Sequence, residues 1–196
     1  MEVCGRYALD ADIDILIERY KAIIAEREIK TKSEIFPTDS QPIITERDGR
    51  RIELAKWGFM PHYAKRPLIN ARGETVHEKP TFRKSFLSGR CLVPATAFFE
   101  WEEKGDKKIK RKISVEDIAI FSMAGLYEDF ISKEGNKFRA YTILTSDANS
   151  QMSQIHDRMP VILSPEDEEK WLDPGQIDIG KLRELVVTST LHLIIE

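Results

Sequence analysis

The sequence predicts an α+β fold of one domain, residues 1–196, with a strongly bent, barrel-like and mostly antiparallel sheet flanked by helices. Two observations carry this prediction. Short segments rich in β-branched and aromatic residues follow one another through the middle of the chain, separated by clusters of Gly, Lys and Asp. Helical patterns are confined to the N-terminal part and the last third of the chain. The chain is long enough to bury a substantial core, and no repeat or linker divides it.

Helices are expected in four places. The first runs through residues 12–28, where Asp10 can act as the cap and the apolar residues fall on one stripe. This stripe consists of Ile13, Leu16, Ile17, Tyr20, Ile23 and Ile24. Pro165 suits the first turn of a later helix. The later helical segments are residues 147–155, 164–172 and 179–185.

Strands are expected between these helices. Arg47-Asp48-Gly49-Arg50 has the composition of a tight turn, so the segments on either side of it should form a hairpin. The expected strands are residues 42–46, 51–59, 91–95, 97–101, 109–115, 119–128 and 139–145.

Composition excludes several classes of protein. Hydrophobic residues make up 41% of the chain and charged residues 32%, which is ordinary for a soluble protein. No stretch approaches the roughly 18 apolar residues of a membrane span, and the start lacks a signal pattern, so we expect a cytoplasmic protein. Cys4 and Cys91 are then expected as free thiols. Without a CxxC motif or His at ligand spacing, neither a metal site nor a cofactor is expected.

Basic residues are concentrated in one part of the chain, although the net charge is −3. Residues 56–112 contain fourteen Lys and Arg against six Asp and Glu, and the other residues contain sixteen against twenty-seven. Such asymmetry is typical of a face suited to a polyanion. The alternative is that KGDKKIKRK, residues 104–112, is only a solvated hairpin with exposed lysines.

Strand alternation in FFEW puts Phe99 and Trp101 on one face and Phe98 and Glu100 on the other. A buried carboxylate there would have a raised pKa and could transfer protons, whereas an edge-strand Glu would simply face water. His156 could equally be a hydrogen-bonded structural residue, and the polar residues of NARGET could be capping or turn residues. Four stretches thus hold candidate reactive groups: CGRY (4–7), NARGET (70–75), FFEW (98–101) and IHDRMP (155–160).

Together these stretches resemble the SOS-response-associated peptidase family, also called abasic-site processing proteins. The resemblance covers nearly the whole chain, and the order and spacing of its uncommon blocks make a chance match very improbable. It implies a single α+β domain around a barrel-like sheet. It also implies binding of single-stranded DNA and covalent capture of abasic sites through an N-terminal cysteine, in the response to DNA damage. The shared blocks are CGRY, Pro37, WGFMP (57–61) and residues 67–86, 90–101, 144–163 and 171–172.

The resemblance implies roles for individual residues. Cys4 matches the nucleophile, and Asn70 matches the group that holds the reacting sugar. Glu100 matches the acid/base, and His156 the second proton-transfer group. The residues expected to contact DNA are Arg72 and Arg158 at phosphates, Arg83 and Arg6 as further backbone contacts, and Pro37, Trp57 and Trp101 in the surrounding groove.

An N-terminal Cys suits this chemistry for a physical reason. The ring-opened abasic sugar carries an aldehyde, and an α-amino group with a pKa of about 7.7–8.0 is far more often a free amine at neutral pH than Lys. The amine can form an imine, and the thiol of the same residue can then close a five-membered thiazolidine. Alignment of the two groups provides effective molarities on the order of 10⁵ M or more.

The chain departs from the family pattern in two places. His62-Tyr63 stands where many relatives have Trp, so we expect a weaker stacking platform rather than loss of binding. Met1-Glu2-Val3 precedes Cys4, and an acylated nitrogen cannot condense with an aldehyde. We therefore expect these three residues to be a removable leader, a misassigned start or an artificial addition. Attack of the Cys4 thiol on the preceding carbonyl would be one route of removal.

Three hypotheses follow. The first is a covalent trap for abasic sites in single-stranded DNA, with lyase activity as a side reaction. The second is a thiol peptidase that uses Cys4, Glu100 and His156. The third is a non-catalytic binder of single-stranded nucleic acid. For the first we expect a monomer that needs no metal or membrane, cytoplasmic and associated with the nucleoid when it is bound to DNA.

Overall fold

The computed structural model describes residues 4–25, 29–187 and 189–196. Five strands form a closed barrel in which neighbours follow the order β11-β10-β7-β4-β5. A parallel pairing of Ala140 with Lys56 and of Tyr141 with Trp57 joins β5 back to β11 and closes it. The predicted α+β fold with a barrel-like, mostly antiparallel sheet is therefore confirmed. These strands are β4 (Ser40–Glu46), β5 (Arg50–Trp57), β7 (Arg90–Ala95), β10 (Phe121–Ile131) and β11 (Lys137–Asp147).

Short strands extend this sheet beyond the barrel. The strand β2 pairs with β5, β13 pairs with β10, and β6 and β12 both pair with β11. The last two matter most for function, because they bring two distant segments of the chain to the end of the same barrel strand. The short strands are β2 (Ile23–Ile24), β6 (Asn70–Arg72), β12 (Arg158–Pro160) and β13 (Ile162–Leu163).

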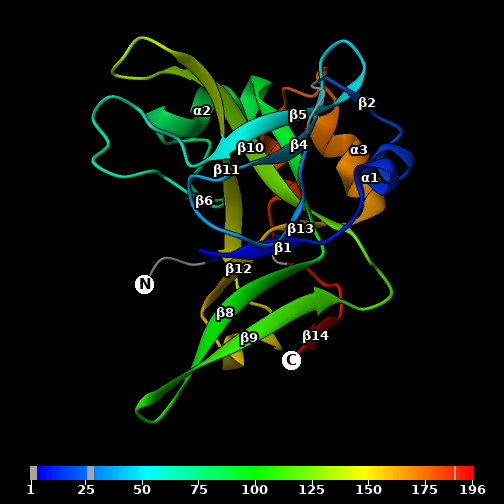
Figure 1. The fold of residues 1–196 in the computed structure, drawn as a ribbon, viewed down its shortest axis with the longest axis vertical. Coiled ribbons are helices and arrows are strands. Elements are labelled where there is room, and N and C mark those ends of the chain that lie inside the picture. The colour runs from blue at the N-terminus through cyan, green and yellow to red at the C-terminus, as the bar shows by residue number, and fades with distance from the viewer. Residues whose placement is uncertain (1–3, 26–28, 188) are drawn as a thin grey trace.

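A second sheet of five strands follows the order β14-β9-β8-β1-β3. The strand β1, which comes first in the sequence, lies between the barrel and the long β8–β9 hairpin (Figure 1). This hairpin projects away from the rest of the molecule. The turn of this hairpin includes Gly105 at φ 58°. Its strands are β1 (Tyr7–Leu9), β3 (Lys32–Ile35), β8 (Ala97–Lys104), β9 (Lys107–Val115) and β14 (Leu193–Ile195).

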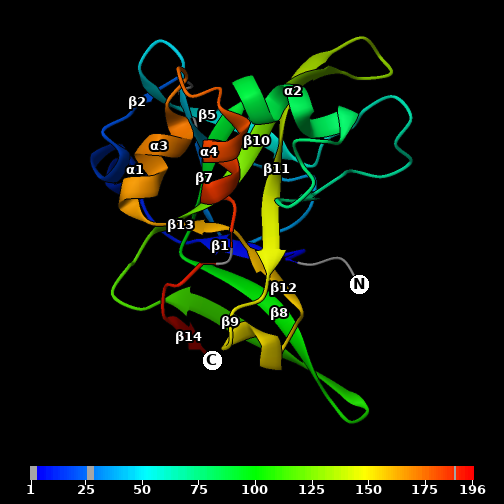
Figure 2. The same cartoon turned by 180° about the vertical axis from the view of Figure 1, so that it is seen from behind.

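Helices cover the outside of the barrel. Figure 2 shows α2, α3 and α4 on the side of β7 and β10. Ser164 caps α3 by accepting a hydrogen bond from the backbone nitrogen of Asp167, and Pro165 occupies the first turn as predicted. No helix in the described part of the chain is long and apolar enough to cross a membrane. The helices are α1 (Ile13–Tyr20), α2 (Pro80–Ser88), α3 (Pro165–Leu172), α4 (Ile179–Leu185) and the short 3₁₀ helix η1 (Met152–Gln154).

The first helix is shorter than predicted. It begins after Asp12 rather than Asp10, and ends at Tyr20 because Lys21 takes a left-handed conformation with φ 50°. Ile23 and Ile24 leave the helical stripe and pair with β5 instead. Residues 26–28, the end of the predicted helix, lie outside the described residues.

Further regions differ from the sequence prediction, and two of them are helical. The segment 147–155 begins with the last residue of β11, Asp147, and contains only the short helix η1. The helix α2 was not predicted, although Pro80 stands at its start, where its fixed φ and missing N–H cost nothing. Gly49, at φ 92°, lies in the predicted turn between β4 and β5, so that hairpin is confirmed.

Candidate active site

Cys4 and Glu100 meet through the pairing of β1 with β8. Tyr7 lies opposite Phe98 in this antiparallel ladder, and the backbone nitrogen of Phe99 donates to the carbonyl of Arg6 at 2.9 Å. The same register carries the chain before β1 toward Glu100. The backbone nitrogen of Cys4 donates a hydrogen bond of 2.5 Å to Oε1 of Glu100, and both residues are buried.

The two faces of β8 have the different roles that alternation predicted. Phe98 lies fully buried in the main core. Phe99 and Trp101 pack on the opposite face with Ala8 and Ala97. Glu100 is only 3% exposed, so the interpretation as an edge-strand Glu facing water is wrong.

Burial raises the pKa of Glu100 above its ordinary value, because the charged carboxylate loses solvation. Hydrogen bonds from the backbone nitrogens of Cys4 and Trp101 and the charge of His156 act in the opposite direction. A carboxyl balanced in this way holds its proton at a higher pH than an exposed Glu does. A carboxyl with a raised pKa is suited to accepting and returning protons near neutral pH.

The Cys4 side chain is fully buried, and its backbone is unusual. Burial, together with the nearby Glu100 charge, raises the pKa of its thiol well above the ordinary value. The thiol is therefore held in its neutral form. The backbone φ of 46° is in the left-handed region, which costs a residue other than glycine roughly 1–2 kcal/mol. Strain of this kind is frequently found at functional sites.

His156 follows η1 and lies close enough to Glu100 for its charge to act on that carboxyl. When the ring is neutral at Nδ1, this atom accepts a hydrogen bond of 3.1 Å from the backbone nitrogen of Arg158. When Nδ1 is protonated, it faces Oδ1 of Asp157 at 2.8 Å instead. These contacts orient the imidazole, whose side chain is 12% exposed. The structure thus brings together Cys4, Glu100 and His156 from three distant parts of the chain.

Asn70 and Arg72 lie at the ends of β6, which runs parallel to β11. Asn70 pairs with Ile143, and Arg72 pairs with Thr145. Asn70 is half-buried and Arg72 is exposed, whereas Ala71 between them is buried. An exposed guanidinium beside the site is suited to contact with a phosphate.

Arg158 reaches the other side of β11 through β12, where it pairs with Asp147. Its guanidinium donates to both carboxylate oxygens of Glu74 at 2.6 and 2.9 Å, to Asp147 at 2.7 Å and to the carbonyl of Thr145 at 2.7 Å. The Arg158 side chain is only 9% exposed. A phosphate would therefore have to compete with two carboxylates for this group.

The remaining predicted DNA contacts belong to separate segments of the chain. The guanidinium of Arg6 stacks on Phe36 at 4.3 Å and on Trp101 at 5.1 Å, and it donates to Glu34 at 3.0 Å. Pro37 is half-buried in the segment that follows Phe36. The described structure leaves Arg83 exposed on α2.

Trp57 was expected in the groove that surrounds the DNA. Its side chain is fully buried in this structure and presents no ring surface to solvent. The chain turns sharply after it at Gly58, which has φ 119° and where a Cβ atom would lie 2.5 Å from Cβ of Pro67. Tyr63, by contrast, is exposed, with its hydroxyl hydrogen-bonded to Thr81, and so keeps the predicted stacking face.

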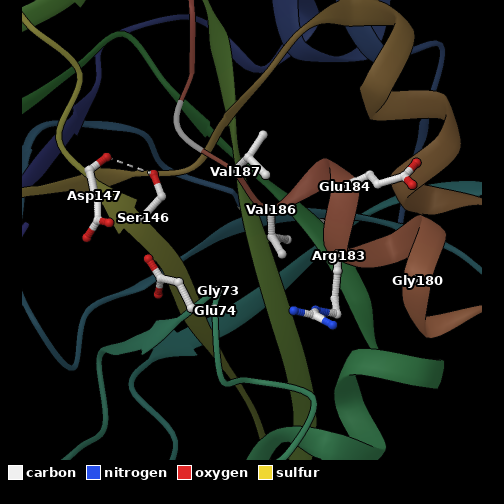
Figure 3. Close-up of a pocket in the computed structure, with 9 residues that line it drawn as sticks. All are labelled: Gly73, Glu74, Ser146, Asp147, Gly180, Arg183, Glu184, Val186 and Val187. Carbon is white, nitrogen blue, oxygen red and sulfur yellow. Dashed lines mark hydrogen bonds between the residues drawn. The ribbon is translucent and has the colours of Figure 1, made fainter.

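A cavity of about 510 Å³ lies beside the Arg158 network and not at Cys4. Figure 3 shows Glu74 and Asp147 on one side of it and Arg183 of α4 on the other. Glu74 lies within the NARGET stretch, but its pairing with Arg158 could not be read from the sequence. In the described part of the chain, no group of three His, Cys, Asp or Glu side chains could hold a metal ion.

The model of the SOS response associated peptidase (SRAP) family matches residues 3–193. The chain is 38% identical over 193 residues to the abasic site processing protein YoqW of Bacillus subtilis (strain 168), covering 94% of this chain and 86% of that one. It is 32% identical over 181 residues to the abasic site processing protein YedK of Escherichia coli (strain K12), covering 87% and 79%. A crystal structure of a protein from Bacteroides thetaiotaomicron superposes with a TM-score of 0.87 at 29% identity, covering 98% of this chain and 91% of that one. The chain belongs to the SOS response associated peptidase (SRAP) family.

Proposed function

We propose that this protein binds single-stranded DNA and captures abasic sites by a covalent bond to Cys4. One observation carries the proposal: the backbone nitrogen of Cys4 lies 2.5 Å from the carboxyl of Glu100. If Cys4 is the first residue, this nitrogen is an α-amine with an acid/base group in direct contact. The names of the relatives YoqW and YedK support abasic sites as the substrate.

The reaction would proceed in three balanced steps. Protonated Glu100 gives its proton to the aldehyde oxygen as the amine of Cys4 adds to the carbonyl carbon, and it then takes a proton from the nitrogen, which leaves a carbinolamine. Glu100 next protonates the hydroxyl so that water leaves, and it takes the second proton from the nitrogen, so that a neutral imine forms. The Cys4 thiol adds across the imine, its proton passes to the nitrogen, and a thiazolidine results.

Neighbouring residues have supporting roles in this scheme. Asn70 would hold the sugar by hydrogen bonding, and His156 would assist proton transfer during ring opening or β-elimination of the strand. The second of these reactions gives a lyase activity as a side reaction. Arg72 would bind a phosphate directly. Arg158 would do so only after exchanging a carboxylate partner.

The proposal requires Cys4 to be N-terminal. Residues 1–3 lie outside the described residues, and we include their removal in the proposal. The left-handed φ of Cys4 supports this step, because the angle ceases to exist once the preceding peptide bond is cut and its strain is then relieved. In the route we favour, the Cys4 thiol attacks the preceding carbonyl, and the peptide bond to the Cys4 nitrogen breaks to give a thioester and a free amine. Water then hydrolyses the thioester, which releases the leader and restores the thiol.

A general thiol peptidase is supported less well. Such enzymes use a thiolate whose pKa is lowered by a cation or an adjacent base. Burial and Glu100 instead raise the pKa of the Cys4 thiol. We therefore restrict peptidase chemistry to a slow, single cleavage next to Cys4.

The test uses a single-stranded oligonucleotide with one abasic site and three forms of the protein. One form begins Met-Cys4, so that removal of Met exposes the amine. A second retains Glu2 and Val3, with its intact mass verified, and a third carries Cys4→Ala in the first form. Only the first should give a DNA–protein band that survives denaturation. An equal yield from the mass-verified second form would refute the amine mechanism. If the first form gives no band, covalent capture is refuted, and the hypothesis of a non-covalent binder of single-stranded nucleic acid is favoured.

A further inference from the structure

The two sides of the candidate site belong to different sheets. Cys4 leads into β1 of the five-stranded sheet, whereas Asn70 begins β6, which pairs with barrel strand β11. Among the described residues, β1 forms backbone ladders with β3 and β8 alone. Side chains must therefore contribute to fixing the position of Cys4 relative to Asn70.

Three buried aromatic side chains provide such a connection. Tyr7 of β1 and Tyr141 of β11 share a hydrogen bond of 2.6 Å between their hydroxyl oxygens. Trp57 of β5 contacts both, with ring centroids 5.1 Å from Tyr7 in an edge-on arrangement and 6.4 Å from Tyr141 in a stacked one. All three are fully buried, so none can touch DNA.

Trp57 also holds the residue next to Asn70. Its Nε1 donates a hydrogen bond of 3.0 Å to the carbonyl of Ile69. The same carbonyl accepts a hydrogen bond of 3.0 Å from the backbone nitrogen of Ile143 in β11. A continuous series of contacts thus runs from the strand after Cys4, through the aromatic cluster, to the residue before Asn70.

We propose that Tyr7, Trp57 and Tyr141 are positioning residues that set the placement of Cys4 relative to Asn70. The chemical purpose of this placement rests on the proposed function, in which Asn70 holds the sugar that Cys4 attacks. A displacement of about 1 Å between reacting groups can slow a reaction by on the order of 10²-fold. A rigid connection beneath the site would prevent such a displacement.

The simpler explanation is that these aromatic residues only stabilise the core. Tyr20 offers a matched control, because its buried hydroxyl makes a hydrogen bond of 2.8 Å with the Ser122 hydroxyl and it is 1% exposed. That bond ties α1 to β10, and neither element carries a predicted site residue. Tyr20→Phe should therefore cost similar stability without affecting the site.

The first experiment does not depend on DNA. Iodoacetamide labelling of Cys4 and Cys91 is followed by peptide mass spectrometry in the wild type, Tyr7→Phe, Tyr141→Phe and Tyr20→Phe. Both thiols are fully buried, so labelling reports local opening. Loss of the tyrosine bond should speed labelling of Cys4 roughly five- to tenfold, and more than it speeds labelling of Cys91. Unchanged Cys4 labelling, or an equal increase in Tyr20→Phe, would overturn the proposal.

The second experiment measures crosslinking at saturating abasic-site DNA, together with affinity for undamaged single strands. Tyr7→Phe and Tyr141→Phe should slow crosslinking roughly 10- to 100-fold at unchanged affinity, and the double variant should be no slower than the slower single one. Tyr20→Phe should react like the wild type. Every protein in this experiment begins Met-Cys4, so that the amine is exposed. If this form without a further substitution gives no adduct but Tyr7→Phe still exposes Cys4 selectively, the proposed function is wrong and the positioning role stands. If the wild type reacts and all three variants behave alike, the positioning role is wrong.

Discussion

Cys4 and Glu100 are 96 residues apart in the sequence, yet the backbone nitrogen of one donates a hydrogen bond of 2.5 Å to the carboxyl of the other. A backbone N–H needs only an acceptor, and any carbonyl would satisfy it. Here the acceptor is a buried carboxyl whose pKa is raised by desolvation. Burying a carboxyl for this purpose costs more free energy than using a backbone carbonyl as the acceptor. The pairing is therefore poorly explained by stability, and it fits a site where the nitrogen has to exchange protons.

Glu100→Gln should slow crosslinking by roughly 10²–10⁴-fold, because Gln keeps the shape of the side chain but cannot exchange the proton. His156→Ala should slow the reaction in the same way, since it is assigned a proton-transfer role. Affinity for undamaged single-stranded DNA should stay within about twofold for both variants. Measurement of crosslinking rate alongside affinity checks this, and a parallel loss of affinity would contradict the assignment.

The stability of Glu100→Gln should depend on pH. Because the pKa of Glu100 is raised in the folded protein, the folded state binds this proton more tightly than the unfolded state does. The contribution of the group is fully present below its ordinary pKa of 4.5 and is lost as the pH rises through the folded value. The variant should therefore gain stability relative to the wild type as the pH rises above 4.5. Urea unfolding at several pH values tests this, and a pH-independent difference would argue against a raised pKa.

Cys4→Ala should abolish the covalent adduct, whereas Cys91→Ala should retain it. Cys91 lies fully buried in β7, and burial raises the pKa of its thiol well above the ordinary value. It therefore acts as a small apolar core residue. Denaturing gels of both variants with abasic-site DNA give the answer, and the reverse pattern would mean that the wrong cysteine has been assigned.

Replacement of Arg72 and of Arg158 should have different effects on the free energy of unfolding and on DNA binding. Arg72 is exposed, so Arg72→Ala should change the free energy of unfolding by less than about 0.5 kcal/mol. It should also reduce the salt slope of single-strand binding by about 0.7. Arg158→Ala breaks hydrogen bonds to Glu74, Asp147 and Thr145 and should cost roughly 2 kcal/mol. Thermal melts and salt titrations separate the two effects, and equal melts would contradict this contrast.

Neutralising Lys107, Lys108 and Lys110 should leave crosslinking at low salt almost unchanged. The segment 104–112 forms the tip and second strand of the β8–β9 hairpin, as the simpler interpretation of its charge expected. Several of its cations already face carboxylates, among them Lys110 with Glu34 and Lys108 with Glu103. A crosslinking assay of the triple Gln variant at two salt concentrations checks this. Complete loss of the adduct at low salt would make the hairpin part of the site.

Several features could be read directly from local sequence. Pro165 and its preceding Ser mark the start of α3, and the turn at Gly49 marks the hairpin of β4 and β5. Alternation in β8 separates Glu100 from Trp101. These features depend on residues within a few positions of one another, so their physical cause is present in a short stretch of chain.

Other features resisted prediction because a distant partner decides them. Ile23 and Ile24 continue a helical stripe in the sequence, but pairing with β5 makes them a strand. Trp57 lies in a family block, yet the rings of Tyr7 and Tyr141 bury it in the core. Tertiary contacts override local propensity whenever their burial and hydrogen bonding outweigh the small differences between local conformations.

The sequence by itself determined the fold class, the reactive residue types and the family to which the chain is similar. Only the tertiary structure decided that β5 returns to β11 and closes the barrel, and that Arg158 is held by Glu74. It also decided that Glu100 contacts the nitrogen of Cys4. Composition and spacing specify which groups are available, because they are properties of the chain itself. The contacts between these groups depend on the free energy of packing segments that are far apart in the sequence. This free energy cannot be read from any local pattern.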